Sequence, residues 1–300
     1  RHWLFEEALP LWSTVGVDDR HGGFHEALGL DAVPLVRPKR MRTMARQVYG
    51  FAVAKARGWD GPADLLIAHG LDFMSSGRTG RGGWVRTFNV EGSVSDATED
   101  AYDHSCVLLA LAHAHMCGNA DALELGRETF AFLDEHLEDS SLAGFLEAPE
   151  GGSLRRSNPH MHLLEAFLAW HEATGDRTYA RKLYASAVAN GLNRATGLAY
   201  GAVSKQGMPL DLVSRSWPQT EAIKASIALD RADGPDLKPE IEARVGRLFR
   251  WHIDPAPVGL WIDRIDERGR SVAAEVPASI FYHLVYALTQ YLDATVEKGQ

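Results

Sequence analysis

The sequence predicts an all-α protein built from repeated helical hairpins, and three observations support this fold class. A loop in which glycine precedes an apolar or aromatic residue recurs at 22–24, 82–84, 144–145, 197–200 and 259–261. Two stretches with helical periodicity lie between successive loops. The first helix of each pair carries one ionisable residue amid apolar neighbours, at intervals of 58 to 62 residues. The repeat unit is therefore an αα-hairpin plus a loop, stacked in an open solenoid or closed into a toroid.

The expected helix boundaries follow from prolines, glycines and capping residues along the chain. One helix is expected at 2–11, before the first loop, and another at 275–292, after the last. Four hairpins lie between them, at 38–57 with 61–75, 100–116 with 120–136, 158–173 with 177–189, and 216–232 with 237–251. Strand-like runs are short and confined to the loops.

The recurring ionisable residues form the candidate site. They are Arg46, His104, His162, Glu221 and His283. We interpret the first helices as inner, so a closed ring would bring the five side chains to one cavity. An open solenoid gives no reason to repeat an ionisable group, which favours the toroid. Arg46 is expected to be buried, because its stretch is rich in alanine and valine.

These residue types suit proton transfer on a sugar. Histidine is the natural proton carrier near neutral pH, and arginine can stabilise a developing oxyanion. Nearby aromatic residues such as Tyr49, Trp217 and Trp261 could stack on the C–H faces of a sugar. The isolated histidines His113, His115 and His171 are interpreted as core residues, and His160 as a loop-facing or supporting residue.

Metal ligands and other binding signatures are not evident in the sequence. His160 and His162 point to different helix faces, and no metal-binding motif occurs, so we expect no metal and no cofactor. A net charge of −9 without a basic stripe argues against nucleic acid. No apolar run approaches 18 residues, which argues against a membrane span. Cys106 and Cys117 cannot bridge within one helix, so a cytoplasmic location fits best.

Five motifs resemble those of the N-acylglucosamine 2-epimerase superfamily, most closely its mannose isomerase and mannose-6-phosphate isomerase-like branch. The motifs occur in the family's order along the chain, and the third and fourth are specific together. They are Arg42-x-x-x-Arg46-Gln47-Val48-Tyr49, Tyr102-Asp103-His104-Ser105-Cys106, Asn158-Pro159-His160-Met161-His162, Trp217-Pro218-Gln219-Thr220-Glu221 and Tyr282-His283.

The resemblance implies a metal-free (α/α)6 toroid that acts on sugars, here as a single domain over 1–300. It implies that Arg46 stabilises enediolate oxygens, that His162 assists ring opening or proton transfer, and that His283 is the base at carbon 2. Glu221 would orient or hydrogen-bond the substrate, and His104 would line the pocket floor. The predicted substrate-binding set is His104, Tyr49, Asn158, Glu165, Trp217, Gln219 and Trp261.

The sequence departs from the family in one respect. Relatives usually carry a Gly-His-x-x-Glu piece between the motifs that match His162 and Glu221, and nothing between Ala166 and Trp217 has this form. A six-hairpin ring also needs one more polar inner helix than we count. We therefore expect a repeat to be absent near 174–179.

The resulting hypothesis is a metal-independent aldose–ketose isomerase that converts D-mannose to D-fructose or a close relative. The alternatives are a sugar 2-epimerase, a mannose-6-phosphate isomerase, a glycoside hydrolase or lyase, and a non-catalytic sugar-binding toroid. A phosphate could be bound by Arg155, Arg156 and Arg215 in loops before inner helices. The only expected partner is a small-molecule sugar, with a homodimer left open.

Overall fold

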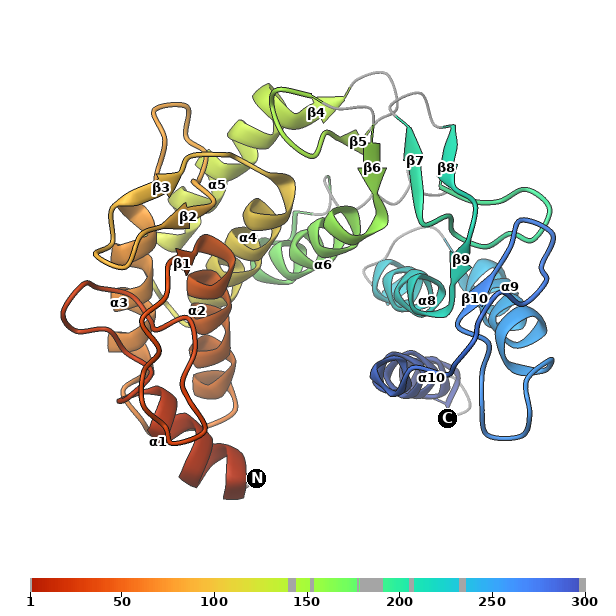
Figure 1. The fold of residues 1–300 in the computed structure, drawn as a ribbon, viewed down its shortest axis with the longest axis horizontal. Coiled ribbons are helices and arrows are strands. Elements are labelled where there is room, and N and C mark those ends of the chain that lie inside the picture. Colours follow the sequence, from red (N-terminus) through yellow and green to blue (C-terminus); the bar gives the residue numbers. More distant parts are fainter. Residues whose placement is uncertain are drawn as a thin grey trace. The chain divides into compact units, whose positions relative to one another are not determined.

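The structure is a computed structural model that describes residues 2–139, 144–151, 154–176, 178, 191–204, 208–231 and 236–296 (Figure 1). Its contacts divide the chain into two compact units. Unit 1 comprises Arg1–Glu138, Phe145–Gly151 and Glu165–Asp176, and unit 2 comprises Asp139–Gly144, Gly152–Leu164 and Arg177–Gln300. The single domain expected over 1–300 stays a prediction.

Unit 1 is built on two helical hairpins. It opens with a π-helical turn, Trp3–Ala8, and α1, Leu9–Trp12. The first hairpin pairs α2, Met41–Ala56, with α3, Ala63–Ser75, and the second pairs α4, Ala101–Met116, with α5, Ala122–Phe132, which continues into a π-helical turn at Leu133–Leu137. The inner helices α2 and α4 also pack against each other. A small antiparallel sheet is formed by β1, Lys39–Arg40, β2, Thr87–Phe88, and β3, Val94–Asp96. β1 comes directly before α2 in the chain, and β2 and β3 come before α4.

Unit 2 repeats this arrangement with α8, Ser216–Arg231, between α9, Lys238–Leu248, and α10, Phe281–Val296. A π-helical turn, Phe249–Ile253, extends α9, and a 3-10 turn, Ala278–Ile280, precedes α10. The strands β6, Leu154–Arg156, β7, Ala202–Ser204, and β8, Pro209–Asp211, form one antiparallel sheet. A second sheet pairs β9, Ser214–Arg215, with β10, Arg264–Ile265.

Three elements contribute residues to both units. The helix α6 spans Ser157–Thr174, and the strands β4, Glu138–Asp139, and β5, Gly144–Phe145, pair with each other. Among the described helices, none is long and apolar enough to cross a membrane.

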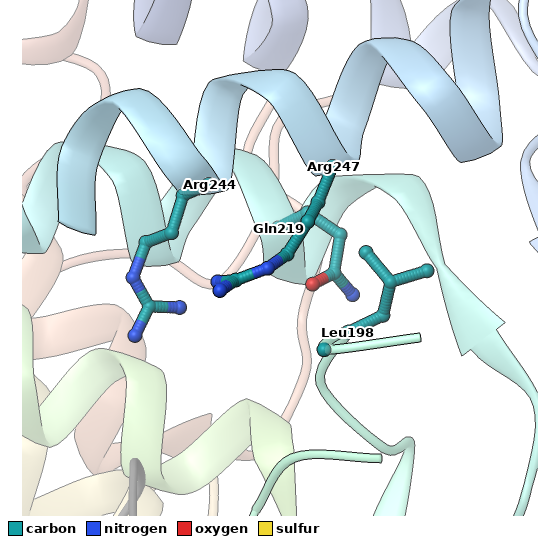
Figure 2. Close-up of a pocket in the computed structure, with 5 residues that line it drawn as sticks. Leu198, Gln219, Arg244 and Arg247 are labelled. Carbon is teal, nitrogen blue, oxygen red and sulfur yellow. The ribbon is translucent and has the colours of Figure 1, made fainter. Parts of the chain in front are cut away.

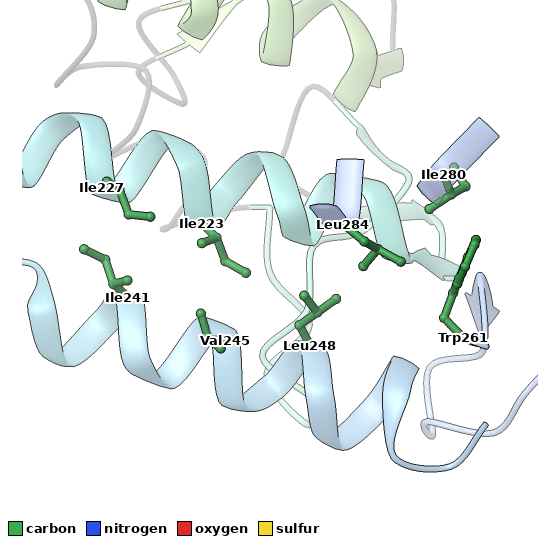
Figure 3. Packing of buried hydrophobic residues seen from close by; sticks show 8 residues of the cluster. All are labelled: Ile223, Ile227, Ile241, Val245, Leu248, Trp261, Ile280 and Leu284. Atoms are coloured by element: carbon green, nitrogen blue, oxygen red, sulfur yellow. The ribbon is translucent and has the colours of Figure 1, made fainter. Parts of the chain in front are cut away.

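The core of unit 2 lies between α8 and α9 and closes at one end against α10. Figure 3 shows Ile223 and Ile227 of α8 facing Ile241, Val245 and Leu248 of α9. Trp261, Ile280 and Leu284 complete the cluster. Since the apolar residues of each helix recur at helical spacing, burying this stripe is what fixes the hairpin.

The expected helices agree with the structure to within a few residues, with one clear exception. The last helix begins at Phe281, after the 3-10 turn, and not at residue 275. Pro277 has an extended ψ of 118°, and the residue before a proline disfavours the helical region, so a helix cannot run through this point. The helix expected at 177–189 lies outside the described residues, apart from residue 178.

Three of the loops are each hydrogen-bonded to a side chain of the inner helix that follows them. The backbone N–H of Phe24 donates to Met44 Sδ at 3.3 Å, that of Trp84 to His104 Nε2 at 3.1 Å, and that of Ala199 to Gln219 Oε1 at 2.9 Å. In each case donor and acceptor are 20 residues apart. We call the position shared by Met44, His104 and Gln219 the anchor position.

A buried ion pair closes the first loop. Lys39 is 2% exposed, and its ammonium donates to Asp18 Oδ2 at 2.7 Å and to the carbonyl oxygen of Gly22. Asp18 also accepts the backbone N–H groups of Arg20 and His21. Burial alone would raise the pKa of Asp18, but these hydrogen bonds and the positive charge of Lys39 outweigh it and lower the pKa to about 2.

Candidate active site

The candidate site in unit 2 is centred on an ion pair between two neighbouring helices. Glu221, in the second turn of α8, and His283, in the first turn of α10, are joined by a contact of 2.7 Å between Oε1 and Nδ1. Their side chains are 18% and 15% exposed, so both are largely shielded from water while still reachable. The ring of Trp217 lies 6.1 Å from the His283 ring, centre to centre.

This geometry suits His283 to proton transfer. An ionised Glu221 accepts the proton of Nδ1, which leaves Nε2 as the basic nitrogen of the neutral ring. The same contact stabilises the imidazolium that forms when Nε2 takes a proton. A carboxylate that orients a histidine in this way is a recurring arrangement for general acid–base catalysis.

In unit 1 two guanidinium groups surround the ring of Tyr102. Arg46 donates to the Tyr102 hydroxyl at 2.8 Å, and the Cζ atoms of Arg42 and Arg46 lie 5.1 and 5.5 Å from the ring centre. Arg42 Nε lies 2.9 Å from Asp103 Oδ1. Burial raises the pKa of Asp103, and the charge of Asp100 acts in the same direction, while Arg42 opposes both. Arg46 is exposed, so the expectation that it is buried is wrong.

His104 and Gln219 serve the fold through their polar atoms. His104 is completely buried; its Nε2 accepts from Trp84, and its Nδ1 lies 2.7 Å from the carbonyl oxygen of Asp100. Burial lowers the pKa of His104, which keeps the ring neutral. Gln219 uses its amide in the same way, accepting from Ala199 and donating to Ala199 and Arg215 carbonyls. We therefore leave both residues out of the proposed site.

The anchor position also corrects the repeat register. Because Met44, His104 and Gln219 are equivalent, the residues two positions later are Arg46, Cys106 and Glu221. The sequence interpretation placed His104 in the series of Arg46 and Glu221, although Cys106 holds that place. A spacing of roughly 60 residues could not resolve a difference of two.

We expect His104→Gln to be tolerated better than His104→Leu. Glutamine performs the anchor function at Gln219, whereas leucine would leave the N–H of Trp84 buried without an acceptor, at a cost of about 1–3 kcal/mol. Urea unfolding of the two variants measures the difference. If the leucine variant were as stable as the glutamine variant, the anchor bond would contribute nothing.

The remaining residues of the predicted site differ in how far they are buried. Trp261 is buried in the core of unit 2, with its ring stacked on Phe281 at 6.2 Å, so we leave it out of the proposed site. Tyr49 is half-buried, with its ring edge against His113 at 4.8 Å. His162 is partly buried, whereas Asn158 and Glu165 are exposed.

Sequence reasoning missed Lys224. Its ammonium lies 2.7 Å from Glu221 Oε2, so Glu221 is held on one oxygen by His283 and on the other by Lys224. Glutamate and lysine three residues apart are common on exposed helix faces, and this spacing alone gave no signal. What distinguishes this pair is burial, because the Lys224 side chain is only 19% exposed.

A hollow elsewhere in unit 2 does not qualify as a ligand site. Figure 2 shows Arg244 and Arg247 of α9 beside Gln219 and the loop that carries Leu198. The hollow has no space for a water molecule, and both arginines contact Glu240. Among the described residues, no group of three or more histidines, cysteines or acidic residues could hold a metal ion.

Comparisons with known proteins identify the chain's relatives. Mannose-6-phosphate isomerase of Rhizobium meliloti is 28% identical over an alignment of 375 positions, gaps included, which covers 97% of this chain and 95% of that protein. D-mannose isomerase of Thermobifida fusca is 33% identical over 190 residues, covering 61% of this chain and 46% of that protein. A sugar epimerase from a ruminal bacterium has a similar structure, with a TM-score of 0.81, 17% identity, and coverage of 100% of this chain and 81% of that chain.

These findings confirm the predicted fold class, an all-α (α/α)6 toroid, and an enzyme of the isomerase or epimerase class. The family model for N-acylglucosamine 2-epimerase matches residues 22–182 and 178–287. The two matches overlap at 178–182, next to the place where the sequence predicts a missing repeat. Together they span most of the chain, and the chain belongs to the N-acylglucosamine 2-epimerase family.

Proposed function

We propose that this protein is a metal-independent aldose–ketose isomerase that converts D-mannose, or a close relative, to the corresponding ketose. The observation that carries the proposal is the shielded contact between Glu221 and His283, because isomerisation needs a positioned base of near-neutral basicity. The names of the two curated relatives, a mannose-6-phosphate isomerase and a D-mannose isomerase, support the choice of sugar.

In the proposed reaction His283 Nε2 removes the proton from carbon 2 of the open-chain aldose. The electrons form the enediolate double bond between carbons 1 and 2, and the proton then returns to carbon 1. The proton of the carbon 2 hydroxyl passes to the oxygen on carbon 1. The carbon 2 hydroxyl thereby becomes a carbonyl and the carbon 1 aldehyde becomes a hydroxyl, so the step is redox-neutral within the sugar. One base is sufficient, since the proton leaves and returns on the same face of a cis-enediol.

Arg46 retains the role implied by the sequence resemblance, stabilisation of the enediolate oxygens. The Arg46 residue is exposed, and its guanidinium donates to the Tyr102 hydroxyl, which orients it. A fixed guanidinium lowers the energy of a developing oxyanion without itself losing a proton. His162, which is partly buried, is proposed to assist ring opening or proton transfer.

Whether the sugar carries a phosphate is a separate question within this proposal. Of the three arginines suggested for a phosphate, Arg215 is exposed and lies 3.4 Å from Asp263, so its charge is partly compensated. The side chains of Arg155 and Arg156 lie outside the described residues. We therefore propose the free sugar as substrate and test the phosphorylated one beside it.

Incubation with D-mannose in D₂O, followed by NMR, tests the proposal, with mannose 6-phosphate as a parallel sample. We expect fructose with deuterium at carbon 1, because the proton carried by His283 can exchange with solvent before it returns. Turnover of mannose 6-phosphate alone would replace the free sugar by the phosphorylated one.

Other outcomes would contradict the isomerase assignment. Deuterium at carbon 2 of mannose and glucose, with no ketose, would identify a 2-epimerase. Binding of mannose without any exchange would identify a sugar-binding protein that has lost catalysis. Cleavage of an oligosaccharide would identify a hydrolase or lyase.

A further inference from the structure

We propose that Lys224 is a positioning residue for the Glu221–His283 pair: it holds the Glu221 carboxylate in the orientation that accepts Nδ1–H of His283. This inference rests on the proposed function, in which His283 is the base. It adds a third member, in the third turn of α8, to two residues that the sequence analysis named separately.

The contacts give Lys224 this role. Glu221 offers one oxygen to each partner, with Oε1 at 2.7 Å from His283 Nδ1 and Oε2 at 2.7 Å from Lys224 Nζ. Because both partners are fixed to helices that pack against each other, the carboxylate cannot rotate without losing one contact. A side chain that is confined in this way keeps the imidazole in one tautomer and one orientation.

Burial makes the lysine contact worth more than a surface ion pair. The three side chains are between 15% and 19% exposed, so solvent screens their charges only in part. A pair at three-residue spacing on an exposed helix face contributes a few tenths of a kcal/mol. Here the same spacing places Lys224 against Glu221, whose other oxygen contacts His283. The lysine contact is therefore stronger than such an exposed pair.

Two described neighbours of His283 lie on α8. Glu221 contacts the imidazole and is itself in contact with Lys224, while Trp217 presents an apolar ring. The 3-10 turn that packs against α10 carries alanine, serine and isoleucine and contributes no titratable group. On α9, which packs against the other side of α8, Arg244 and Arg247 both contact Glu240.

The expected effect on catalysis follows from the loss of one contact. Without Lys224 the Glu221 carboxylate is held by His283 alone and gains rotational freedom, so it orients the imidazole less well. kcat should therefore fall, whereas KM should change little.

The test compares Lys224→Met with Lys224→Arg, which keeps the charge, and with Lys238→Met, which removes an exposed lysine of α9. For Lys224→Met we expect kcat to fall about 10-fold with a small change in KM. The arginine and Lys238 variants should retain the wild-type kcat. An unchanged kcat, or a change in KM alone, would overturn the proposal.

A second readout needs neither substrate nor turnover. The ¹⁵N shifts of His283 report whether Nδ1 carries the proton, and circular dichroism reports whether each variant is folded. We expect Lys224→Met to mix the two tautomers of His283 and Lys224→Arg to preserve one. If His283 were shown to be dispensable for activity, the proposed function would fail, while an unchanged tautomer in Lys224→Met would overturn the positioning role by itself.

Discussion

Replacing His283 by alanine is expected to lower kcat by roughly 10²- to 10⁴-fold, the usual cost of losing a positioned general base. The imidazole is the group that carries the carbon 2 proton in the proposed reaction, and its contact with Glu221 fixes which nitrogen does so. Initial rates of ketose formation measure the loss. Deuterium exchange at carbon 2 should fall in parallel, because both depend on the same proton abstraction.

Val285→Ala provides the matched control for this substitution. Val285 lies two residues further along α10, and its side chain is 44% exposed. Truncating it removes a side chain of the same helix without touching the pair, so we expect wild-type kcat. An alanine variant at His283 with near wild-type activity on the true substrate would refute the assignment of the base.

Replacing Asp18 by alanine is expected to destabilise the protein by roughly 3–5 kcal/mol, because it leaves the buried ammonium of Lys39 without its counterion. Urea unfolding, followed by tryptophan fluorescence, measures the change in the free energy of unfolding. Asp19→Ala is the control, since the neighbouring Asp19 is exposed and should change stability by less than about 0.5 kcal/mol.

The double variant Asp18→Ala with Lys39→Met separates the charge effect from packing. Removing both partners avoids a buried unpaired charge, so the double variant should be more stable than Asp18→Ala alone. A double variant that is no more stable would show that the loss came from the loop hydrogen bonds.

The same pair predicts how stability depends on pH. The pKa of Asp18 is about 2 in the folded protein, below the ordinary value of 3.8. A lowered pKa means that the contribution is fully present above the unfolded value and is lost as pH falls through the folded value. The stability deficit of Asp18→Ala relative to the wild type should therefore shrink progressively between about pH 4 and pH 2.

The sequence predicted the fold class and most helix boundaries, and it named Glu221 and His283 as separate candidates, because periodicity, prolines and short motifs are local signals. It did not predict that these two side chains contact each other. It could not tell a buried anchor from a ligand-binding group. His104 and Glu221 both lie in inner helices amid apolar residues, yet one bonds to a loop N–H and the other to a neighbouring helix. The role of each side chain depends on its hydrogen-bond partner, and these partners are distant in sequence.

Lys224 is a residue whose role the sequence did not indicate. A lysine three residues after a glutamate is usually a solvated surface pair, so nothing in the sequence marks it. Its significance depends on how far α10 covers this face of α8, which is a property of packing. Arg46 gave the opposite error, since alanine and valine around it suggested burial although the residue is exposed.

The hydrogen bonds at the anchor position join each loop to its own inner helix, so the loop and the helix form one local structural unit. Since donor and acceptor are 20 residues apart in all three described cases, the closure needs no residue from another repeat. Such short-range closure costs little loop entropy and can form early in folding. A chain organised in this way can lose or gain a whole loop–helix unit without breaking the anchor hydrogen bonds of the others. Family members can therefore differ in length by complete repeats.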